Sequence, residues 1–423
     1  MEFLHIEQVL LIVLLGALVA LAARRLRIPY TVGLVIAGLL ASFLPVSFGF
    51  SLSKELLFNI LLPPLIFEAA LYIQWKELRR DLPLIFTYAT VGVLLSAAVT
   101  AVFMHYVAGW GWEASALFAV LIAATDPVSV IATFKEAKVE GRLRLLVEAE
   151  SLFNDGTAAV AFALVLAYAN GQTLTFSGSA WMLAGSVFGG IICGLLVGGF
   201  AYFVIGQTSD HLVELSMTTV AAFGSFWLAE HFHMSGILAT TAAGLLMGNF
   251  TALGTMTEKG EQSVGHFWDF AAFVVNAVIF IILGVNAAYQ NFALFLWPIL
   301  VAIFAVLAGR AIAVYPCSAA FRASRLYVSA NHQHVLFWGG LRGALALALA
   351  LGIPASLPYS QEIQTVTFGV VAFSVFVQGL TIPSLLRRLG EMPENRTGIT
   401  KNAEDPPSKL SENVTDEEFS RIR

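Results

Sequence analysis

Apolar runs long enough to cross a bilayer follow one another along most of the chain, separated by short polar segments. A helix needs about 20 mainly apolar residues to cross the hydrocarbon core. We interpret thirteen runs as spans, of which the run at 29–44 is short. They cover residues 6–23, 29–44, 55–73, 82–108, 113–135, 143–169, 178–206, 211–230, 234–252, 263–289, 292–322, 335–352 and 362–388. The pattern predicts an all-α polytopic membrane protein of about thirteen transmembrane helices.

The composition supports this class. Of the 423 residues, 58% are hydrophobic and 12% are charged, whereas a soluble domain carries about 25% charged residues. The two cysteines, Cys193 and Cys317, lie inside apolar runs and do not have the spacing of a disulfide framework or a metal site. We interpret both as packing residues.

The basic residues predict an orientation. If alternate loops are cytoplasmic, those loops and the C-terminal segment hold 20 of the 23 Lys and Arg residues, and the opposite loops hold only Lys54. This bias is the positive-inside pattern. It places the N-terminus outside and the C-terminus in the cytoplasm, and we expect a cell (plasma) membrane location. Residues 1–388 form the predicted transmembrane domain, and the polar segment 389–423 is predicted to be a short disordered cytoplasmic tail.

Ionisable residues inside the predicted spans are candidates for function. A charge at mid-bilayer costs at least about 2.5–3.5 kcal/mol, so such residues are rare and usually functional. The clear cases are Glu68, Asp126, Glu150, Asp155, Arg310 and Arg342, while Glu214 and Asp269 lie nearer to span ends.

One of these acids lies at a predicted helix break. In "AATDPVSV" (123–130), Pro127 has no N–H and disfavours helix at Thr125 and Asp126. The freed carbonyls cannot face lipid, so they must line a protein-walled or wet cavity. Such carbonyls beside carboxylates are suited to a small cation. The Asp126 side chain could bind the ion or could chiefly hold the broken helix ends.

Two further stretches carry most of the remaining polar residues. In "EAESLFNDGTAAVAF" (148–162), Glu150 and Asn154 form one i, i+4 row and Ser151 and Asp155 form a second. In "FWGGLRGALALALAL" (337–351), Arg342 lies among three glycines, and this span could be a second broken helix. Interrupted helices at mid-depth are how many secondary transporters build their substrate sites.

Several motifs in order make the sequence similar to a known family. The chain resembles sodium/proton antiporters of the NhaP/NHE type over about residues 6–390. The motifs are "LLPPLIFEAAL" (61–71), "ATDPVSV" (124–130), "ESLFNDGTA" (150–158), "HFWDFAAFVVNAVIFIILG" (266–284), "RAIAVY" (310–315) and "GGLRGALALALAL" (339–351). The resemblance implies inverted repeats with two crossing unwound helices, a core bundle that includes about 55–169 and 263–388, and a dimerisation domain.

The resemblance also implies roles for residues. Asp155 is the carboxylate for which Na⁺ and H⁺ compete, and Asn154 is its neutral neighbour. The cation shell is completed by Thr125, Asp126, Ser151 and Glu68. Glu150 and Arg342 form a structural ion pair, and Arg310 and Asp269 support the core. Because Asn154 cannot titrate, the Asn-Asp pair resembles the electroneutral class that exchanges one Na⁺ for one H⁺.

We therefore expect a secondary transporter that exchanges Na⁺, or also Li⁺, for H⁺ by alternating access, as a homodimer and without a cofactor. A K⁺/H⁺ or broad-selectivity antiporter stays open, because selectivity depends on fine cavity geometry. A cation channel is a weaker alternative. The sequence contains no His-Glu-x-x-His motif and no nucleotide-binding glycine loop, which argues against an enzyme and an ATP-driven pump.

Overall fold

The computed structural model of the chain describes residues 6–26, 28–43, 54–137, 139–172, 175–250 and 256–392. These residues form helices joined by short connections, and no strand occurs among them. Seven of the described helices are long and apolar enough to cross a membrane, and four shorter apolar helices accompany them. The chain is therefore a multi-pass membrane protein, as predicted. The number of thirteen crossings stays a prediction.

The helices follow the predicted runs closely. In chain order they are α1 (Ile6–Leu26), α2 (Tyr30–Ala41), α3 (Lys54–Leu56), α4 (Leu62–Leu71), α5 (Trp75–Thr87), α6 (Val93–Tyr106), α7 (Trp112–Leu121), α8 (Val128–Ala137), α9 (Arg142–Ala169), α10 (Phe176–Ile205), α11 (His211–Thr219), α12 (Ser225–His231), α13 (Gly236–Phe250), α14 (Glu258–Ala288), α15 (Leu296–Ala320), α16 (Ala330–Trp338), α17 (Ala344–Leu351), α18 (Ser360–Phe373) and α19 (Leu380–Arg388). The run at 29–44 is the short helix α2, and the run predicted to start at residue 82 is helical from Trp75.

Among the described residues, four π-helical turns lie between consecutive α-helical segments. They are η1 (Leu57–Leu61), η2 (Tyr88–Gly92), η3 (Val220–Gly224) and η5 (Ser374–Gly379). Such turns are rare in proteins, and those that occur are often found at functional sites. The first one leads into α4, whose first turn contains Pro63 and Pro64, and each proline removes one N–H donor from this continuous helix. This arrangement sets the direction of α4, which carries Glu68.

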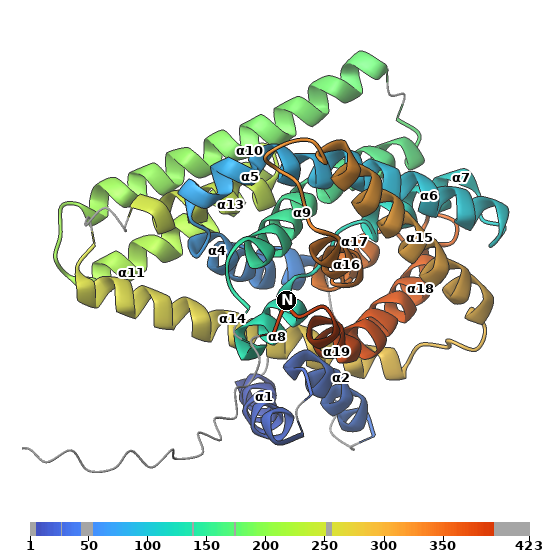
Figure 1. Cartoon of the computed structure of the whole chain (residues 1–423), viewed down its shortest axis with the longest axis horizontal. Helices are drawn as coiled ribbons and strands as arrows, with labels where there is room; N and C mark the ends of the chain where they lie inside the picture. Colours follow the sequence, from blue (N-terminus) through green and yellow to red (C-terminus); the bar gives the residue numbers. More distant parts are fainter. Residues whose placement is uncertain are drawn as a thin grey trace, which may run out of the picture.

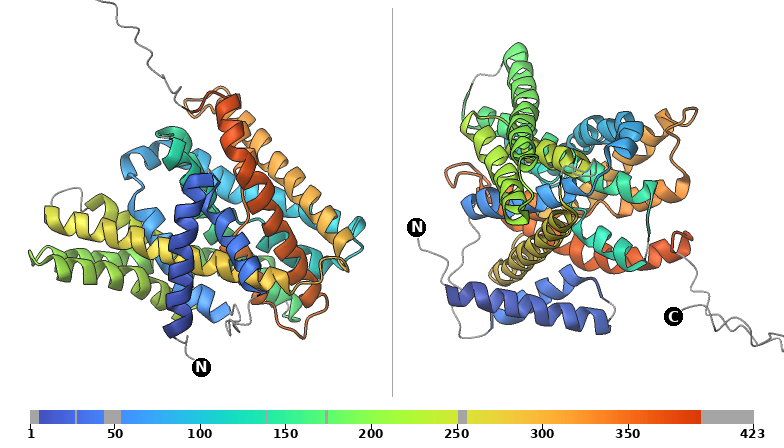
Figure 2. Two further views of the ribbon diagram at one scale, coloured as in Figure 1. Left: turned by 90° about the horizontal axis from the view of Figure 1, so that it is seen from below. Right: turned by 90° about the vertical axis from the view of Figure 1, so that its left-hand side faces the viewer.

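The helices form two neighbouring groups (Figure 1). In one group α10 and α4 pack on α13, and α2 and α11 pack on α14. In the other group α15 packs on α6, and α7 and α5 pack on α9. Helix α9 contacts α4, α10 and α13, so it lies where the groups meet. The paired helices α1 and α2 lie along one side of the molecule, as the right-hand view of Figure 2 shows.

Two predicted spans are broken, as the sequence indicated. The run at 113–135 consists of α7 and α8, with residues 122–127 between them outside any helix. The run at 335–352 consists of α16 and α17, separated by residues 339–343. The predicted tail at 389–423 lies outside the described residues from position 393 onward.

Candidate cation site

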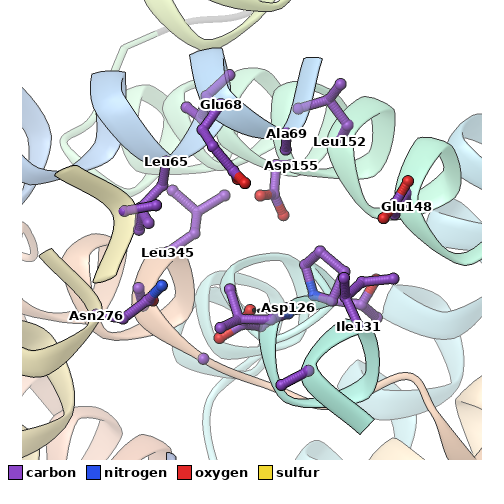
Figure 3. Close-up of a pocket in the computed structure, with 18 of the residues that line it drawn as sticks. Leu65, Glu68, Ala69, Asp126, Ile131, Glu148, Leu152, Asp155, Asn276 and Leu345 are labelled. Atoms are coloured by element: carbon purple, nitrogen blue, oxygen red, sulfur yellow. Dashed lines mark hydrogen bonds between the residues drawn. The ribbon is translucent and has the colours of Figure 1, made fainter. Parts of the chain in front are cut away.

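A cavity of about 260 Å³ lies between the two helix groups. The first group contributes Glu68 from α4 and Asn276 from α14. The second contributes Asp126 from the break before α8, and Leu152 and Asp155 from α9. Figure 3 shows Glu68 and Asp155 directed toward one another across this space, with Asp126 below them. Three carboxylates from separate helices, Glu68, Asp126 and Asp155, therefore line the same cavity.

The Asp-Pro pair ends one helix and begins the next. The Asp126 Oδ1 atom accepts a hydrogen bond from the Val128 amide at 2.9 Å, as an N-cap side chain does. The Pro127 carbonyl accepts the first hydrogen bond of α8, from the Ile131 amide at 2.8 Å, so Pro127 lies directly before the helix, where its missing N–H removes no helical bond. This local chemistry explains why a proline stands in the middle of an apolar run.

The two unwound stretches cross and are hydrogen-bonded to each other. The Asp126 amide donates to the Leu341 carbonyl at 2.8 Å. A Cβ added at Gly343 would overlap the Asp126 carboxylate, so this position needs glycine for the two backbones to approach. The two predicted breaks therefore form one crossing, and the expectation of two crossing unwound helices is confirmed.

Each broken helix has an arginine at the C-terminal end of its first half. The Arg342 Nη1 atom donates to the carbonyls of Ala123 at 2.6 Å and Ala124 at 2.9 Å, just beyond the end of α7. Arg310 donates to the Leu336 carbonyl in the last turn of α16, from Nη2 at 2.8 Å and from Nε at 3.2 Å. Cations are favourable at helix C-termini because they satisfy free carbonyls and oppose the negative end of the dipole.

The predicted ion pair between Glu150 and Arg342 is wrong. Glu150 pairs instead with Arg310, through a two-pronged contact of Nη1 to Oε1 at 2.6 Å and Nη2 to Oε2 at 2.7 Å. A Cβ at Gly340 would meet the Arg310 guanidinium, so the glycine provides the space that this arginine occupies. Arg342 is directed to the carbonyls after α7 and is therefore not the partner of Glu150.

Asn154 and Ser151 hold the unwound stretch in place. The Asn154 Oδ1 atom accepts from the Thr125 amide at 3.1 Å, while Nδ2 donates to Thr125 Oγ1 at 2.6 Å and to Glu150 Oε1 at 3.1 Å. The hydroxyls of Ser151 and Thr125 lie 3.0 Å apart. Neither Ser151 nor Asn154 is among the residues that line the cavity. Their contacts indicate a positioning role for both residues, whereas Thr125 lines the cavity itself.

Asp155 differs from every other acid around the crossing. Its Oδ1 atom is buried and has no hydrogen-bond partner among the described residues. A buried polar atom without a partner is costly unless water or an ion satisfies it. The side chain is directed into the cavity (Figure 3). The unsatisfied oxygen and the neighbouring carboxylates together make this a suitable place for a small cation or a proton.

The cavity continues into a second, charged space. This space has a volume of about 390 Å³ and shares Tyr72, Lys135, Arg144, Glu148 and Asp269 with the first cavity. Its remaining lining includes Gln74 and Glu77 at the start of α5 and Glu140 just before α9. Arg144 and Glu148 form an ion pair at 2.8 Å along α9. The site is therefore reached through a mouth that carries both signs of charge.

Comparisons with known proteins agree with this geometry. Residues 10–388 match the sequence profile of the family described as "Sodium/hydrogen exchanger, transmembrane". The chain belongs to the sodium/hydrogen exchanger family. It is therefore one of a family of antiporters, which are transporters and not enzymes.

Individual relatives resemble this exchanger over most of its length. It is 36% identical over 405 residues to the low-affinity Na⁺/H⁺ antiporter NhaS1 of Synechocystis, covering 92% of this chain and 76% of the relative. It is 38% identical over 367 residues to the Na⁺/H⁺ antiporter ApNhaP of Aphanothece halophytica, covering 86% and 70%. The solved structure of the sodium proton antiporter MjNhaP1 from Methanocaldococcus jannaschii superposes with a TM-score of 0.72 at 21% identity, covering 88% of this chain and 98% of that one. That likeness supports the fold.

Glu148, Asn276 and Lys135 also line the cavity, but the sequence did not single them out as site residues. Glu148 lies seven residues before Asp155, so the two share a face of α9. Asn276 lies seven residues after Asp269 on α14, in the same relation. Lys135 lies near the C-terminal end of α8, whereas Pro127 directly precedes the N-terminal end of that helix. A search for polar residues at helical spacing from the predicted acids would have found the first two.

Proposed function

We propose that this exchanger carries one Na⁺ in exchange for one H⁺, and that both ions use Asp155. The observation that carries the proposal is the buried Asp155 Oδ1 atom, which has no partner among the described residues. Asp126, Glu68 and the Thr125 main chain line the same cavity and supply further oxygen atoms. We assign the Na⁺ shell to these groups, with Ser151 and Asn154 holding Thr125 in position.

Coupling follows from the cost of moving an empty site. A charged carboxylate is penalised when it passes through a dry barrier, because its hydration is lost. Bound Na⁺ and bound H⁺ each neutralise Asp155, so either loaded form can change its exposure while the empty form does so rarely. Because both ions use one carboxylate, they exclude each other. Exchange therefore needs no separate coupling device.

The charge balance supports an electroneutral exchange. Asn154 is neutral and cannot titrate, and its amide is occupied by Thr125 and Glu150. Glu150 is neutralised by Arg310. Asp126 accepts hydrogen bonds from the Val128 and Ala344 amides at two helix N-termini, where a negative charge is favourable. Asp155 has a buried oxygen without a partner among the described residues, and it is the acid that we expect to exchange ions.

The open side of the cavity favours one conformation. The charged mouth is lined by Gln74, Glu77, Glu140 and Gly141, which lie at or beside connections that the positive-inside pattern assigns to the cytoplasm. We infer that the structure is open to the cytoplasm and that the N-terminus lies outside. A plasma-membrane homodimer completes the proposal, supported by the family resemblance, and cross-linking in native membranes would test it.

The direct test is Na⁺-dependent proton flux in proteoliposomes, with the wild-type protein compared with Asp155→Asn. Asparagine keeps the shape of the side chain but can neither titrate nor neutralise Na⁺. We expect the variant to fold and to show no Na⁺-dependent flux above protein-free liposomes. Robust exchange by the variant would overturn the assignment of Asp155. Parallel gradients of K⁺ and Li⁺ decide between a sodium-selective and a broad-selectivity antiporter.

The one-for-one ratio has its own measurement. Electroneutral exchange moves no net charge, so an imposed membrane potential should leave the initial rate unchanged at fixed Na⁺ and pH gradients. A rate that rises or falls with the potential would exclude the electroneutral ratio while leaving antiport itself intact.

A further inference from the structure

Helix α14 presents a line of residues to the cation cavity from the side opposite Asp155. Asp269, Phe273 and Asn276 are spaced by four and three residues, so they share one face of the helix, and all three line the cavity. Across the cavity, Glu148, Leu152 and Asp155 have the same spacing on α9. Asn276 follows Phe273 by one turn on α14, and Asp155 follows Leu152 by one turn on α9, so the two polar side chains occupy matching positions on opposite walls of the cavity.

The Asn276 amide differs from the second asparagine of the same helix. The Asn286 side chain donates to the Ile282 carbonyl at 2.9 Å, within its own helix. The Asn276 side chain makes no hydrogen bond to any residue in the described part of the chain. Its amide group is directed toward the space between Asp126 and Glu68, with the nitrogen foremost (Figure 3), and a half-turn of the amide presents its oxygen there instead. A polar amide in the membrane interior needs a partner, and the cavity is where one can reach it.

We propose that Asn276 is a specificity-determining residue, whose amide oxygen faces the cation bound at Asp155. This inference rests on the proposed exchange of Na⁺ and H⁺. An amide oxygen is a hard neutral ligand of the kind that small cations prefer. Because it carries no charge, it adds to the coordination of the ion and leaves the one-for-one charge balance unchanged.

The position of Asn276 on α14 explains why it can affect selectivity. Asp155, Asp126 and Thr125 all belong to the helix group that contains the crossing, whereas α14 belongs to the other group. Selectivity among alkali cations depends on the number and field strength of the oxygens that replace water. An oxygen supplied from α14 changes the number of oxygen ligands around the ion and leaves the two crossing unwound stretches unchanged. A packing role would instead hold the Asn276 amide against protein atoms.

The test compares Asn276→Ala with the matched control Asn286→Ala in proteoliposomes, with initial rates measured over a range of Na⁺, Li⁺ and K⁺ concentrations. Loss of one neutral contact is expected to raise the apparent KM for Na⁺ by about threefold to tenfold and to change the Na⁺/K⁺ ratio, with a smaller effect on the maximal rate. The Asn286 variant should keep the wild-type KM. Asn276→Ser, which keeps a smaller oxygen, should give an intermediate KM.

A charged replacement separates ion contact from packing. Asn276→Asp adds a second carboxylate that can titrate at the cavity. The pH range over which this variant exchanges ions should therefore differ from that of the wild type, and its exchange rate should depend on the membrane potential. Equal KM values and equal ion ratios for the Asn276 and Asn286 variants would overturn the inference. The proposed function fails separately, since in that case the wild-type protein itself would show no Na⁺-dependent proton flux.

If Asn276→Ala does not yield folded protein, Asn276→Ser and Asn276→Asp carry the same comparison, checked by size-exclusion chromatography. Folded variants that lose maximal rate while keeping the wild-type KM and ion ratio would assign Asn276 to packing or to the conformational step, which also overturns the inference.

Discussion

Glu150 and Asp155 are acids on the same helix, α9, but their surroundings are opposite. Both Glu150 oxygens are bound by the Arg310 guanidinium at 2.6 and 2.7 Å, so this carboxylate is fixed and neutralised. Asp155 has a buried oxygen without a partner in the described part of the chain. A residue that must release its ion in every cycle has to lack such a permanent partner.

Breaking the Glu150–Arg310 pair should damage folding before transport. Removing one partner of a buried ion pair leaves an uncompensated charge and costs about 3–5 kcal/mol. We expect Glu150→Gln to lower the thermal midpoint in detergent markedly and to reduce the yield of folded protein. The double variant Glu150→Gln with Arg310→Gln should recover part of the loss. A double variant at Glu150 and Arg342 that recovers as much would contradict the observed pairing.

Competition at Asp155 predicts how exchange depends on pH. If a proton and Na⁺ occupy the same carboxylate, acidification of the side that supplies Na⁺ should raise the apparent KM for Na⁺ and leave the rate at saturating Na⁺ unchanged. In the limit of strong competition, the apparent KM for Na⁺ rises about tenfold for each unit by which the pH falls, by mass action. Initial rates over a grid of pH and Na⁺ concentration measure this. Separate sites would give a lower saturated rate with no shift in KM.

At the scale of elements, the two broken helices position the site, and the sequence predicts them because their causes are local. Pro127 lacks an amide hydrogen, and it follows an acid that an apolar run would not otherwise contain. The pairing of Glu150 was not predictable in the same way, because Arg310 and Arg342 are both buried arginines in glycine-containing spans. Three-dimensional facts decide between them, namely the free carbonyls after α7 and the space that Gly340 leaves for Arg310.

The crossing itself can be tested by adding one methyl group. A Cβ at Gly343 would overlap the Asp126 carboxylate, so Gly343→Ala should displace Asp126 or α17. Overpacking of this kind costs about 1–3 kcal/mol, and we expect a folded protein with a strongly reduced rate of exchange. Gly199→Ala on α10 is the control, since nothing lies within 4 Å of its added Cβ. Wild-type exchange by the Gly343 variant would show that the crossing tolerates movement.

At the scale of the whole molecule, alternating access requires the mouth of the cavity to close as another path opens. The mouth lies between the two helix groups and carries both signs of charge. Lys135, Arg144 and Glu148 come from α8 and α9, while Asp269 comes from α14. Lys135 lies on α8, the helix that directly follows Pro127, so one short helix joins the break beside Asp126 to a charge at the mouth.

The accessibility of single cysteines tests both the orientation and the open side. The two native cysteines are buried, so replacing Cys193 and Cys317 gives a background in which one added thiol reports its own surroundings. Ile131→Cys lies in the cavity and Glu140→Cys at the mouth. Both should react with a membrane-impermeant thiol reagent from the cytoplasmic face only, and labelling at position 131 should block exchange because it fills the route to Asp155. Labelling from the outer face alone would reverse the orientation, whereas labelling at position 140 without position 131 would show that the two cavities are not one continuous path.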